Sequence, residues 1–341
     1  MGSKVTVDQE IESIRMECPH VVLLGAGASK AALPDGDKNG MPVPLLRDVA
    51  DKLNLSLEFP ESLRHTAEVN FEKAYSQLVE ARDNNVETID RRIRDYFSGL
   101  ELPKTPTLYD TLLLSLRHKD AIFTFNWDPF LLQSRIRLGR LGLESSLPRL
   151  FFLHGNVMLG FCKRDKIRGI VGARCHVCGD VLTPSPLLYP VEKKNYHDGG
   201  LIEGEWKVVQ SELRNAFMIT VFGYSAPTTD VEAVGLLKGA WGDPMQRVME
   251  QTEIITRPNF DEDCLRKTWD PFIHTHHYEI HGSFYCSWIG DHPRRSGEAF
   301  LSQYIDANYI SNNTVPSHFS DMESLADWFG PLMEFEQARK N

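Results

Sequence analysis

Short apolar runs recur along this chain, and longer stretches with helical spacing separate them. The clearest runs are His20–Leu24, Ala121–Phe125, Leu150–Leu153, Phe217–Phe222 and Glu253–Thr256. Each of the first four continues directly into a polar or glycine-containing turn. Continuous apolar runs of this kind are typical of strands that are buried on both faces, as in a parallel sheet covered by helices. The pattern therefore predicts an α/β protein with a doubly wound parallel sheet.

Two inserts are expected in this alternation of strands and helices. Residues 25–120 separate the first two strands, which is too long for one crossover and predicts an inserted helical module at residues 34–118. Helical spacing recurs within it at Leu45–Leu53, Phe71–Ala81 and Ile89–Phe97. Residues 161–200 are rich in Gly, Pro and Cys and show little periodicity, which predicts a small second insert. The remaining segments are the core, at residues 18–160 and 205–310, and a closing C-terminal helix at residues 311–341.

The composition is that of an ordinary globular protein, and its charge balance differs from that of nucleic-acid binders. Apolar residues make up 42% of the chain and charged residues 25%, as is usual for a protein that buries a core. With 37 basic and 47 acidic residues the net charge is −10. We therefore expect no direct nucleic-acid binding, whose affinity comes from neutralised phosphates. The arginines that gather along the chain, Arg135, Arg137, Arg140, Arg294 and Arg295, are expected on solvated helix faces.

The same survey predicts a cytoplasmic protein without a membrane partner. No apolar stretch reaches the roughly 18 residues that a membrane span needs. The segment from Met1 to Glu17 is too polar for a signal peptide. Six cysteines in 341 residues do not make a disulfide framework, which fits a reducing compartment.

Groups that suit nucleotide chemistry follow each of the first four strands. They are Gly25-Ala26-Gly27-Ala28-Ser29, then Asn126 and Asp128 after Thr124, then His154-Gly155, then Gly223-Tyr224-Ser225. In an open α/β sheet, ligands bind beyond the carboxyl ends of the strands, so these groups are expected in one crevice. Each of these residues also has a purely structural interpretation. Asn126, Asp128 and Ser225 are common in turns and at helix caps, and His154 is equally consistent with a strand-end histidine that is hydrogen-bonded within the protein. His281-Gly282 repeats the histidine–glycine pair, but its late position favours His154.

The ordered set of these motifs, from about residue 20 to 240, resembles the sirtuin family. It is most similar to the divergent sirtuin-like domains of bacterial anti-phage systems, which degrade NAD. The resemblance implies an NAD-binding Rossmann-like fold with a helical module and a small insert that sometimes holds zinc. It also implies that Asn126 and Asp128 face the nicotinamide ribose and carboxamide, and that His154 is catalytic. By the same resemblance, Ser29 and the glycines before it hold the pyrophosphate, and Ser225 lies near the adenosine ribose. The full set of cofactor-binding candidates is Gly25, Ala26, Gly27, Ser29, Thr124, Gly223, Tyr224 and Ser225.

The chain departs from the deacylase pattern at two places. Deacylases continue the first motif with a Gly-Ile-Pro-Asp-Phe-Arg loop, whereas this chain reads Ala32-Leu33-Pro34-Asp35-Gly36-Asp37 and lacks the Phe-Arg pair. Phe125 stands where a glutamine is expected. We therefore expect an NAD+ glycohydrolase that releases nicotinamide and ADP-ribose. The alternatives are an NAD-dependent protein lysine deacylase and a non-catalytic module that binds NAD or ADP-ribose for assembly.

The second insert carries a zinc-like cysteine pattern. Cys162-x-x-Asp165 precedes Cys175-x-x-Cys178 by nine residues, which resembles a zinc knuckle with one cysteine replaced. Cys162, Cys175 and Cys178 are the candidate ligands, and Asp165 or His176 completes the tetrahedron, unless the site has decayed. Its role is expected to be structural rather than catalytic.

We also expect the activity to be gated. NAD+ is abundant, so an unrestrained NADase is toxic to its own cell. The helical module and the closing helices offer more surface than a nucleotide site needs, which predicts a homo-oligomer or a partner such as a HerA-like ATPase. The loop Asp35–Pro44 is expected to lie over the cofactor and to order on assembly.

Overall fold

The computed structural model describes residues 4–191, 196, 200–226 and 230–338. At its centre is a six-stranded parallel sheet with the strand order β10-β9-β8-β2-β3-β4. Its strands are β2 (His20–Leu24), β3 (Ala121–Thr124), β4 (Arg149–Phe152), β8 (Met218–Phe222), β9 (Gln251–Ile255) and β10 (Tyr278–His281). The five apolar runs in the sequence correspond to β2, β3, β4, β8 and β9. The prediction of an α/β fold with a parallel sheet is confirmed.

The strand order places a ligand crevice at a defined point of the sheet. Numbered along the chain from β2, the strands lie in the order 3-2-1-4-5-6, which is the order of doubly wound dinucleotide-binding folds. The chain reverses its direction of winding between β2 and β8, which are hydrogen-bonded neighbours from His20–Met218 to Leu24–Phe222. The helices after these two strands, α2 (Ala26–Ala32) and α10 (Val231–Trp241), pack on opposite faces of the sheet, and this leaves a crevice beyond the carboxyl ends of β2 and β8.

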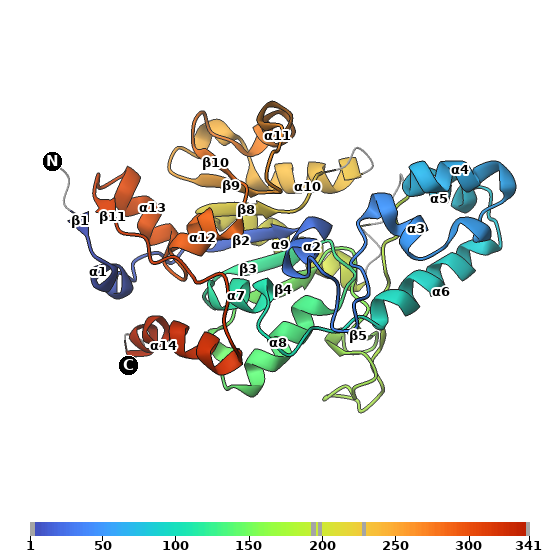
Figure 1. Ribbon diagram of the computed structural model, residues 1–341, viewed down its shortest axis with the longest axis horizontal. Coiled ribbons are helices and arrows are strands. Elements are labelled where there is room, and N and C mark those ends of the chain that lie inside the picture. The colour runs from blue at the N-terminus through green and yellow to red at the C-terminus, as the bar shows by residue number, and fades with distance from the viewer. Residues whose placement is uncertain (1–3, 192–195, 197–199, 227–229, 339–341) are drawn as a thin grey trace.

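Helices cover both faces of the sheet, and the strand residues alternate between two separate cores. Val22 and Leu24 pack with Leu112 and Leu138 on the face of α7 and α8. Val21 and Leu23 pack on the other face, with the apolar residues of α9 and α10. Figure 1 shows α10 and α11 on one side of the sheet and α7 and α8 on the other. Burial on both faces explains why the strands are mostly apolar, without an alternation of polar and apolar positions. The helices are α2 (Ala26–Ala32), α7 (Leu108–Leu114), α8 (Phe130–Arg140), α9 (Leu201–Asn215), α10 (Val231–Trp241) and α11 (Glu262–Trp269).

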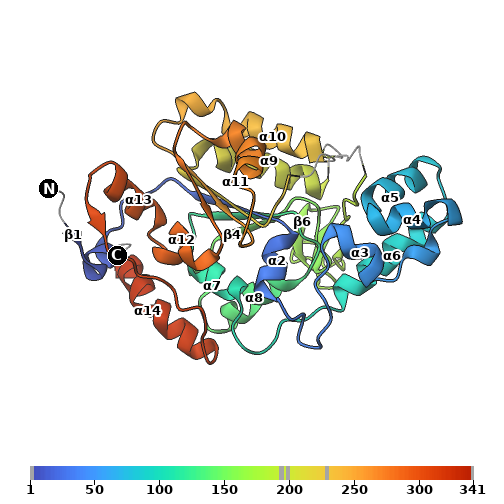
Figure 2. The same cartoon turned by 45° about the horizontal axis from the view of Figure 1, so that its top comes forward.

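The helical module protrudes from one end of the molecule (Figures 1 and 2). The spacing in Phe71–Ala81 and Ile89–Phe97 corresponds to α5 and α6, whose apolar faces are buried. The stretch Leu45–Leu53 is divided into a 3-10 turn and a single helical turn, and the Asp48 carboxylate caps the 3-10 turn by accepting a hydrogen bond from the Leu45 amide. Its elements are η1 (Leu46–Asp48), α3 (Val49–Lys52), η2 (Ser56–Glu58), α4 (Glu61–Val69), α5 (Phe71–Glu80) and α6 (Asn85–Ser98).

The cysteine-containing segment forms a small antiparallel sheet of three strands, in the order β6-β5-β7. Its apolar interior consists of Cys162, Cys175 and Leu182, with Ile167 and Cys178 against them. The strands are β5 (Leu159–Cys162), β6 (Ile167–Ile170) and β7 (Thr183–Pro184).

The two terminal segments pack together at the end opposite the helical module. Two short strands, β1 and β11, pair in parallel, and α14 runs beside α1 (Figure 2). No described helix is both long and apolar enough to cross a membrane. The elements are β1 (Lys4–Val5), α1 (Val7–Glu12), α12 (Trp288–Asp291), α13 (Ser296–Tyr304), β11 (Tyr309–Ile310) and α14 (Met322–Ala338).

The expectation that the clustered arginines lie on solvated helix faces is wrong for Arg294 and Arg295. Both side chains are fully buried, and both donate to the Glu336 carboxylate of α14. On α8, Arg137 pairs with buried Asp110, and Arg135 pairs with Glu144. A pair of arginines is polar in sequence, but a carboxylate and backbone carbonyls distant in sequence hold both side chains in the interior.

Candidate functional site

A cavity of about 1120 Å³ opens at the carboxyl ends of the central strands. Of the candidate catalytic and cofactor-binding residues from the sequence, only Thr124 is absent from its lining. The hydroxyl of Thr124 accepts a hydrogen bond from the Asn126 amide at 3.0 Å, so it supports the turn below the cavity. Residues that line the cavity are Gly25, Ala26, Gly27, Ser29, Asn126, Asp128, His154, Gly223, Tyr224 and Ser225.

The glycines bring the turns after β2 and β8 into backbone contact. A Cβ at Gly25 would lie 2.5 Å from the Gly223 carbonyl oxygen, and one at Gly27 would lie 2.8 Å from the Gly223 Cα. Gly223 itself has a φ of +64°, in the left-handed region that favours glycine. The Gly27 amide donates to the Gly223 carbonyl at 3.0 Å. These glycines are therefore required by the packing of the two turns.

A closed set of hydrogen bonds lies beneath the turn, around Ser29. The Ser29 hydroxyl donates to the Asp128 carboxylate at 2.6 Å. It accepts from the Tyr109 hydroxyl at 2.7 Å and from Asn126 Nδ2 at 2.9 Å. While Asp128 is ionised it can only accept, and in that state Tyr109 is a donor to Ser29. One donated and two accepted bonds use the whole capacity of the Ser29 hydroxyl.

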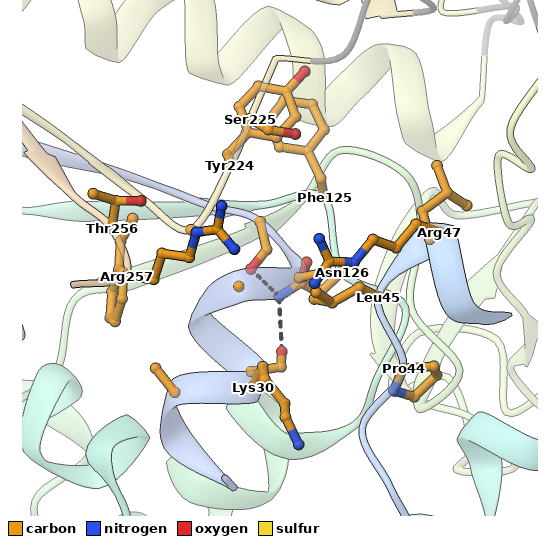
Figure 3. Close-up of a pocket in the computed structure, with 18 of the residues that line it drawn as sticks. Lys30, Pro44, Leu45, Arg47, Phe125, Asn126, Tyr224, Ser225, Thr256 and Arg257 are labelled. Carbon is orange, nitrogen blue, oxygen red and sulfur yellow. Dashed lines mark hydrogen bonds between the residues drawn. The ribbon is translucent and has the colours of Figure 1, made fainter. Parts of the chain in front are cut away.

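The carboxamide of Asn126 is held in one orientation. Its Nδ2 donates to the Gly25 carbonyl at 2.9 Å, and a carbonyl can only accept, so the nitrogen must lie on that side. The carboxamide oxygen, Oδ1, has no hydrogen-bond partner in the described part of the chain. It is also not one of the buried polar atoms that lack a partner there. Since Asn126 lines the cavity, Oδ1 is an acceptor available to a ligand hydroxyl or a water (Figure 3).

Asp128 is a buried carboxyl group with an altered acidity. Burial raises the pKa of Asp128 to about 6, and the hydrogen bonds from Ser29 and the Phe130 amide offset only part of this effect. Asn156 donates from its side chain to the Asp128 carbonyl at 2.6 Å and so fixes the turn. The carboxyl group can therefore change its protonation state near neutral pH.

His154 lies on a floor of aromatic rings. Its Nε2 is 3.0 Å from the Tyr196 hydroxyl. The rings of His154 and Phe125 form a T-shaped pair with centroids 4.9 Å apart, and Phe125 stacks on Tyr224 with centroids 4.1 Å apart. Phe125, at the position where the family resemblance expects a glutamine, therefore supports the imidazole by packing and offers no polar group.

The second histidine–glycine pair, at the end of β10, is engaged differently. His281 Nε2 lies 3.3 Å from Glu253 and 3.4 Å from Glu279. Burial lowers the pKa of His281, but these two carboxylates outweigh it and raise the pKa to about 10. His281 is therefore an ion-paired cation, which agrees with the preference for His154.

Sequence reasoning missed Tyr109, which comes from α7 and contacts the Ser29 hydroxyl beneath the cavity. It also missed the basic residues Lys30, Arg47 and Arg257, which line the cavity from three segments. Arg257 directly follows the fifth apolar run, so the rule used for the first four strand ends could have found it. Tyr109 and Arg47 lie within the long connection between β2 and β3, where no local pattern marks them. In Figure 3, Arg47 and Arg257 extend into the cavity from opposite sides.

The cysteine pattern of the second insert closes into one cluster. The ligand atoms of Cys162, Asp165, Cys175 and Cys178 lie within 4.8 Å of one another, and no other metal-like grouping occurs among the described residues. The Cys162 and Cys178 sulfurs are 3.6 Å apart, and an Asp165 oxygen lies 3.2 Å from the Cys175 sulfur. Tetrahedral zinc with Zn–S bonds of about 2.3 Å needs sulfur–sulfur distances of about 3.8 Å. Three thiolates and a carboxylate fit that ion, with Asp165, not exposed His176, as the fourth ligand.

Comparison with known proteins yields distant structural similarity only. No family model matches the chain, and no curated protein matches it. The chain is similar to a mutant Sir2 homologue in complex with ADP-ribose, at 14% identity and a TM-score of 0.38, over 86% of this chain and 91% of that one. It is also similar to a Sir2 homologue in complex with NAD, at 15% identity and a TM-score of 0.37, over 88% and 92% of the two chains. A Sir2 protein bound to an acetylated peptide matches at 14% identity and a TM-score of 0.34, over 85% and 93%.

Proposed function

We propose that this protein is an NAD+ glycohydrolase that releases nicotinamide and ADP-ribose. The observation that carries the proposal is the convergence of Asn126, Asp128 and His154 in one cavity at the switch point between β2 and β8. This crevice is where doubly wound sheets bind dinucleotides. The cavity is also large enough for a ligand of that size.

The chemistry of NAD+ cleavage agrees with these groups. The glycosidic bond joins ribose to a cationic pyridinium, so nicotinamide leaves as a neutral molecule and needs no general acid. The site must hold the ribose, stabilise an oxocarbenium-like transition state and position a water. Asn126 Oδ1 accepts a ribose hydroxyl or the water, ionised Asp128 contributes negative charge, and His154 takes the proton.

A second candidate, NAD-dependent lysine deacylation, is supported by the other half of the cavity. The helical module contributes Phe71 and Phe97 to its wall, and Leu188 lies there as well. This apolar surface suits an acyl chain. The Phe-Arg pair of the deacylase loop is still absent from residues 32–37, which favours hydrolysis.

We further propose that the enzyme is a gated, cytoplasmic effector of anti-phage defence that acts as a homo-oligomer or with a HerA-like ATPase. The toxicity of unrestrained NAD+ cleavage supports gating. The loop Asp35–Pro44 borders the cavity through Pro44, as gating by this loop requires. Asp37 ties it to the Glu101 amide at 3.1 Å, so a change in this contact would alter the cavity wall.

Nicotinamide release from NAD+ tests these proposals, measured with and without an acetylated peptide across a dilution series of protein. We expect release without peptide, and a higher specific activity where sizing shows assembly. Asn126→Ala and His154→Ala should each lower turnover by about 10²–10⁴. The controls Asn215→Ala and His318→Ala change exposed residues outside the cavity.

Three outcomes would contradict separate parts of the proposal. Release that depends on the peptide would identify a deacylase. Folded Asn126 or His154 variants with wild-type turnover would remove these residues from the mechanism. Constant specific activity down to the monomer would end the assembly hypothesis.

A further inference from the structure

The groups that the sequence assigns to the pyrophosphate are already occupied within the protein. The Gly27 amide donates to Gly223, and the Ala28 amide donates to the Gly25 carbonyl, each at 3.0 Å. The Ser29 hydroxyl has no remaining donor or acceptor, because Asp128, Tyr109 and Asn126 use all three. A phosphate held by Gly27, Ala28 and Ser29 would therefore have to break internal hydrogen bonds.

Three cations in the same cavity have no carboxylate partner in the described part of the chain. Arg257 follows β9, Arg47 lies in η1 and Lys30 lies in α2. Neither arginine makes a described hydrogen bond or ion pair, and the Lys30 ammonium donates only to the Pro34 carbonyl at 2.8 Å. Figure 3 shows the two guanidinium groups extending into the cavity from opposite walls.

Four carboxylates line the cavity, Glu72, Asp128, Asp230 and Asp261, and three of them have hydrogen-bond partners other than these cations. Asp128 accepts from Ser29, and Asp230 accepts from the Tyr224 hydroxyl at 3.0 Å. Asp261 caps α11 by accepting from the Cys264 amide at 3.0 Å. Arg47 and Arg257, which are exposed in the cavity, are therefore available to an anion from outside the protein.

We propose that Arg47 and Arg257, assisted by Lys30, bind the pyrophosphate of the dinucleotide, and that the glycine turn shapes the cavity without holding the phosphates. This inference rests on the proposed function for the identity of the ligand as NAD+. A guanidinium presents parallel donors that match two phosphate oxygens, and two arginines on opposite walls match two phosphates. The two arginines then determine that the site takes a dinucleotide in preference to a nucleoside.

The test is the binding of inorganic pyrophosphate, ADP-ribose and adenosine to the full chain, measured by calorimetry. Arg47→Gln and Arg257→Gln should each weaken pyrophosphate and ADP-ribose by about ten- to a hundredfold, the loss typical of a charged hydrogen bond. Adenosine affinity should stay unchanged. Increasing salt should weaken ADP-ribose binding to the wild type more steeply than to the variants.

Arg266→Gln is the matched control. Arg266 is an exposed arginine on α11 that does not line this cavity. Its substitution removes the same charge from a position outside the proposed anion site. If Arg266→Gln weakens pyrophosphate as much as the two variants do, the effect is a general one of net charge and the inference fails. Equal losses for adenosine and ADP-ribose would show that the arginines maintain the cavity shape, which also overturns it.

The remaining outcomes separate this inference from the proposed function. Pyrophosphate binding that depends on Arg47 and Arg257, in a protein that releases no nicotinamide, would refute the glycohydrolase and leave the anion site. Nicotinamide release with an unchanged KM in both variants would refute the arginine assignment alone. A wild type that binds neither pyrophosphate nor ADP-ribose would overturn the inference.

Discussion

Two pairs of arginines in this molecule differ in how their charge is balanced. Arg294 and Arg295 are fully buried and share the Glu336 carboxylate, with Arg294 Nη2 and Arg295 Nη1 at 2.7 and 2.6 Å from it. Arg47 and Arg257 are exposed in the cavity and have no acidic partner among the described residues. The protein itself supplies the counter-charge in the first pair and leaves it to a ligand in the second.

The difference follows from what burial costs an ion. A guanidinium removed from water needs both a counter-charge and acceptors for its remaining N–H groups. Arg294 donates to the Leu114 and Leu116 carbonyls, and Arg295 donates to the Ile11 and Leu332 carbonyls. These bonds tie the N-terminal segment, α7 and α14 together. Cavity arginines remain hydrated and need no such partners, so they are free to bind.

Removing the Glu336 carboxylate leaves Arg294 and Arg295 without their counter-charge. Glu336→Gln leaves two guanidinium groups buried with a neutral partner, and we expect a loss of about 3–5 kcal/mol in the free energy of unfolding. Denaturant unfolding measures it. Glu336 and its two arginines do not line the cavity, so nicotinamide release from protein that remains folded should be retained.

The control for Glu336→Gln is Glu334→Gln, which changes an exposed glutamate on the same helix. We expect it to alter the free energy of unfolding by less than about 0.5 kcal/mol. Equal stability of the Glu336 and Glu334 variants would show that the buried pair does not anchor α14.

Two buried aspartates differ in charge balance in the same way as the two pairs of arginines. Burial raises the pKa of Asp120, but Lys119 and Arg117 outweigh it and hold the pKa at about 2. Asp128 lacks a cationic partner, and burial raises its pKa to about 6. The carboxylate near the cavity is therefore the one that the protein leaves without a counter-charge.

The stability of the protein should consequently depend on pH through Asp128. The folded state binds a proton more tightly than the unfolded state, so this group favours folding below about pH 4 and loses its contribution as pH rises through 6. A shift of about two units corresponds to about 3 kcal/mol. Urea unfolding of Asp128→Asn between pH 4 and 7 should lack this fall.

Asp120→Asn is the contrasting variant for this measurement. The stabilisation from Asp120 is present above about pH 4 and is lost as pH falls toward 2, so its removal changes the opposite end of the profile. A pH profile of Asp128→Asn that parallels the wild type would show that Asp128 is not a strained carboxylate.

The strands of the sheet and the polar groups that follow them could be predicted from the sequence. The apolar runs located the sheet, and the polar groups at their ends, including Asn126 and His154, do line one cavity. Local pattern could not reveal Arg47, because it lies in a long helical connection and approaches the sheet only in the folded chain. It also misjudged Arg294 and Arg295, because their partner, Glu336, is 42 and 41 residues away. Partners distant in sequence decide which charged residues are buried.

The cysteine cluster is a further site that needs a counter-charge from outside, here a cation. Its four ligand atoms lie together in a module whose apolar interior is only a few side chains, too small to hold three short strands by burial alone. Cys175→Ser and Cys178→Ser should each reduce bound zinc, measured by elemental analysis, and lower the melting temperature by a few degrees. Nicotinamide release should persist in the folded fraction, because these residues do not line the cavity.

Cys18→Ser tests whether this effect belongs to the cluster. Cys18 is an exposed cysteine outside it, so its variant should keep the zinc content and melting temperature of the wild type. Asp165→Asn should behave like the cysteine variants, because an amide is a weaker zinc ligand than a carboxylate. Its effect should be the smallest of the set, since the three thiolates remain. Native protein without zinc, together with unchanged melting in the Cys175 and Cys178 variants, would show that internal hydrogen bonds such as that from Cys175 to Asp165 hold the module. The cluster would then belong with Arg294 and Arg295, as a site whose charges the chain balances by itself.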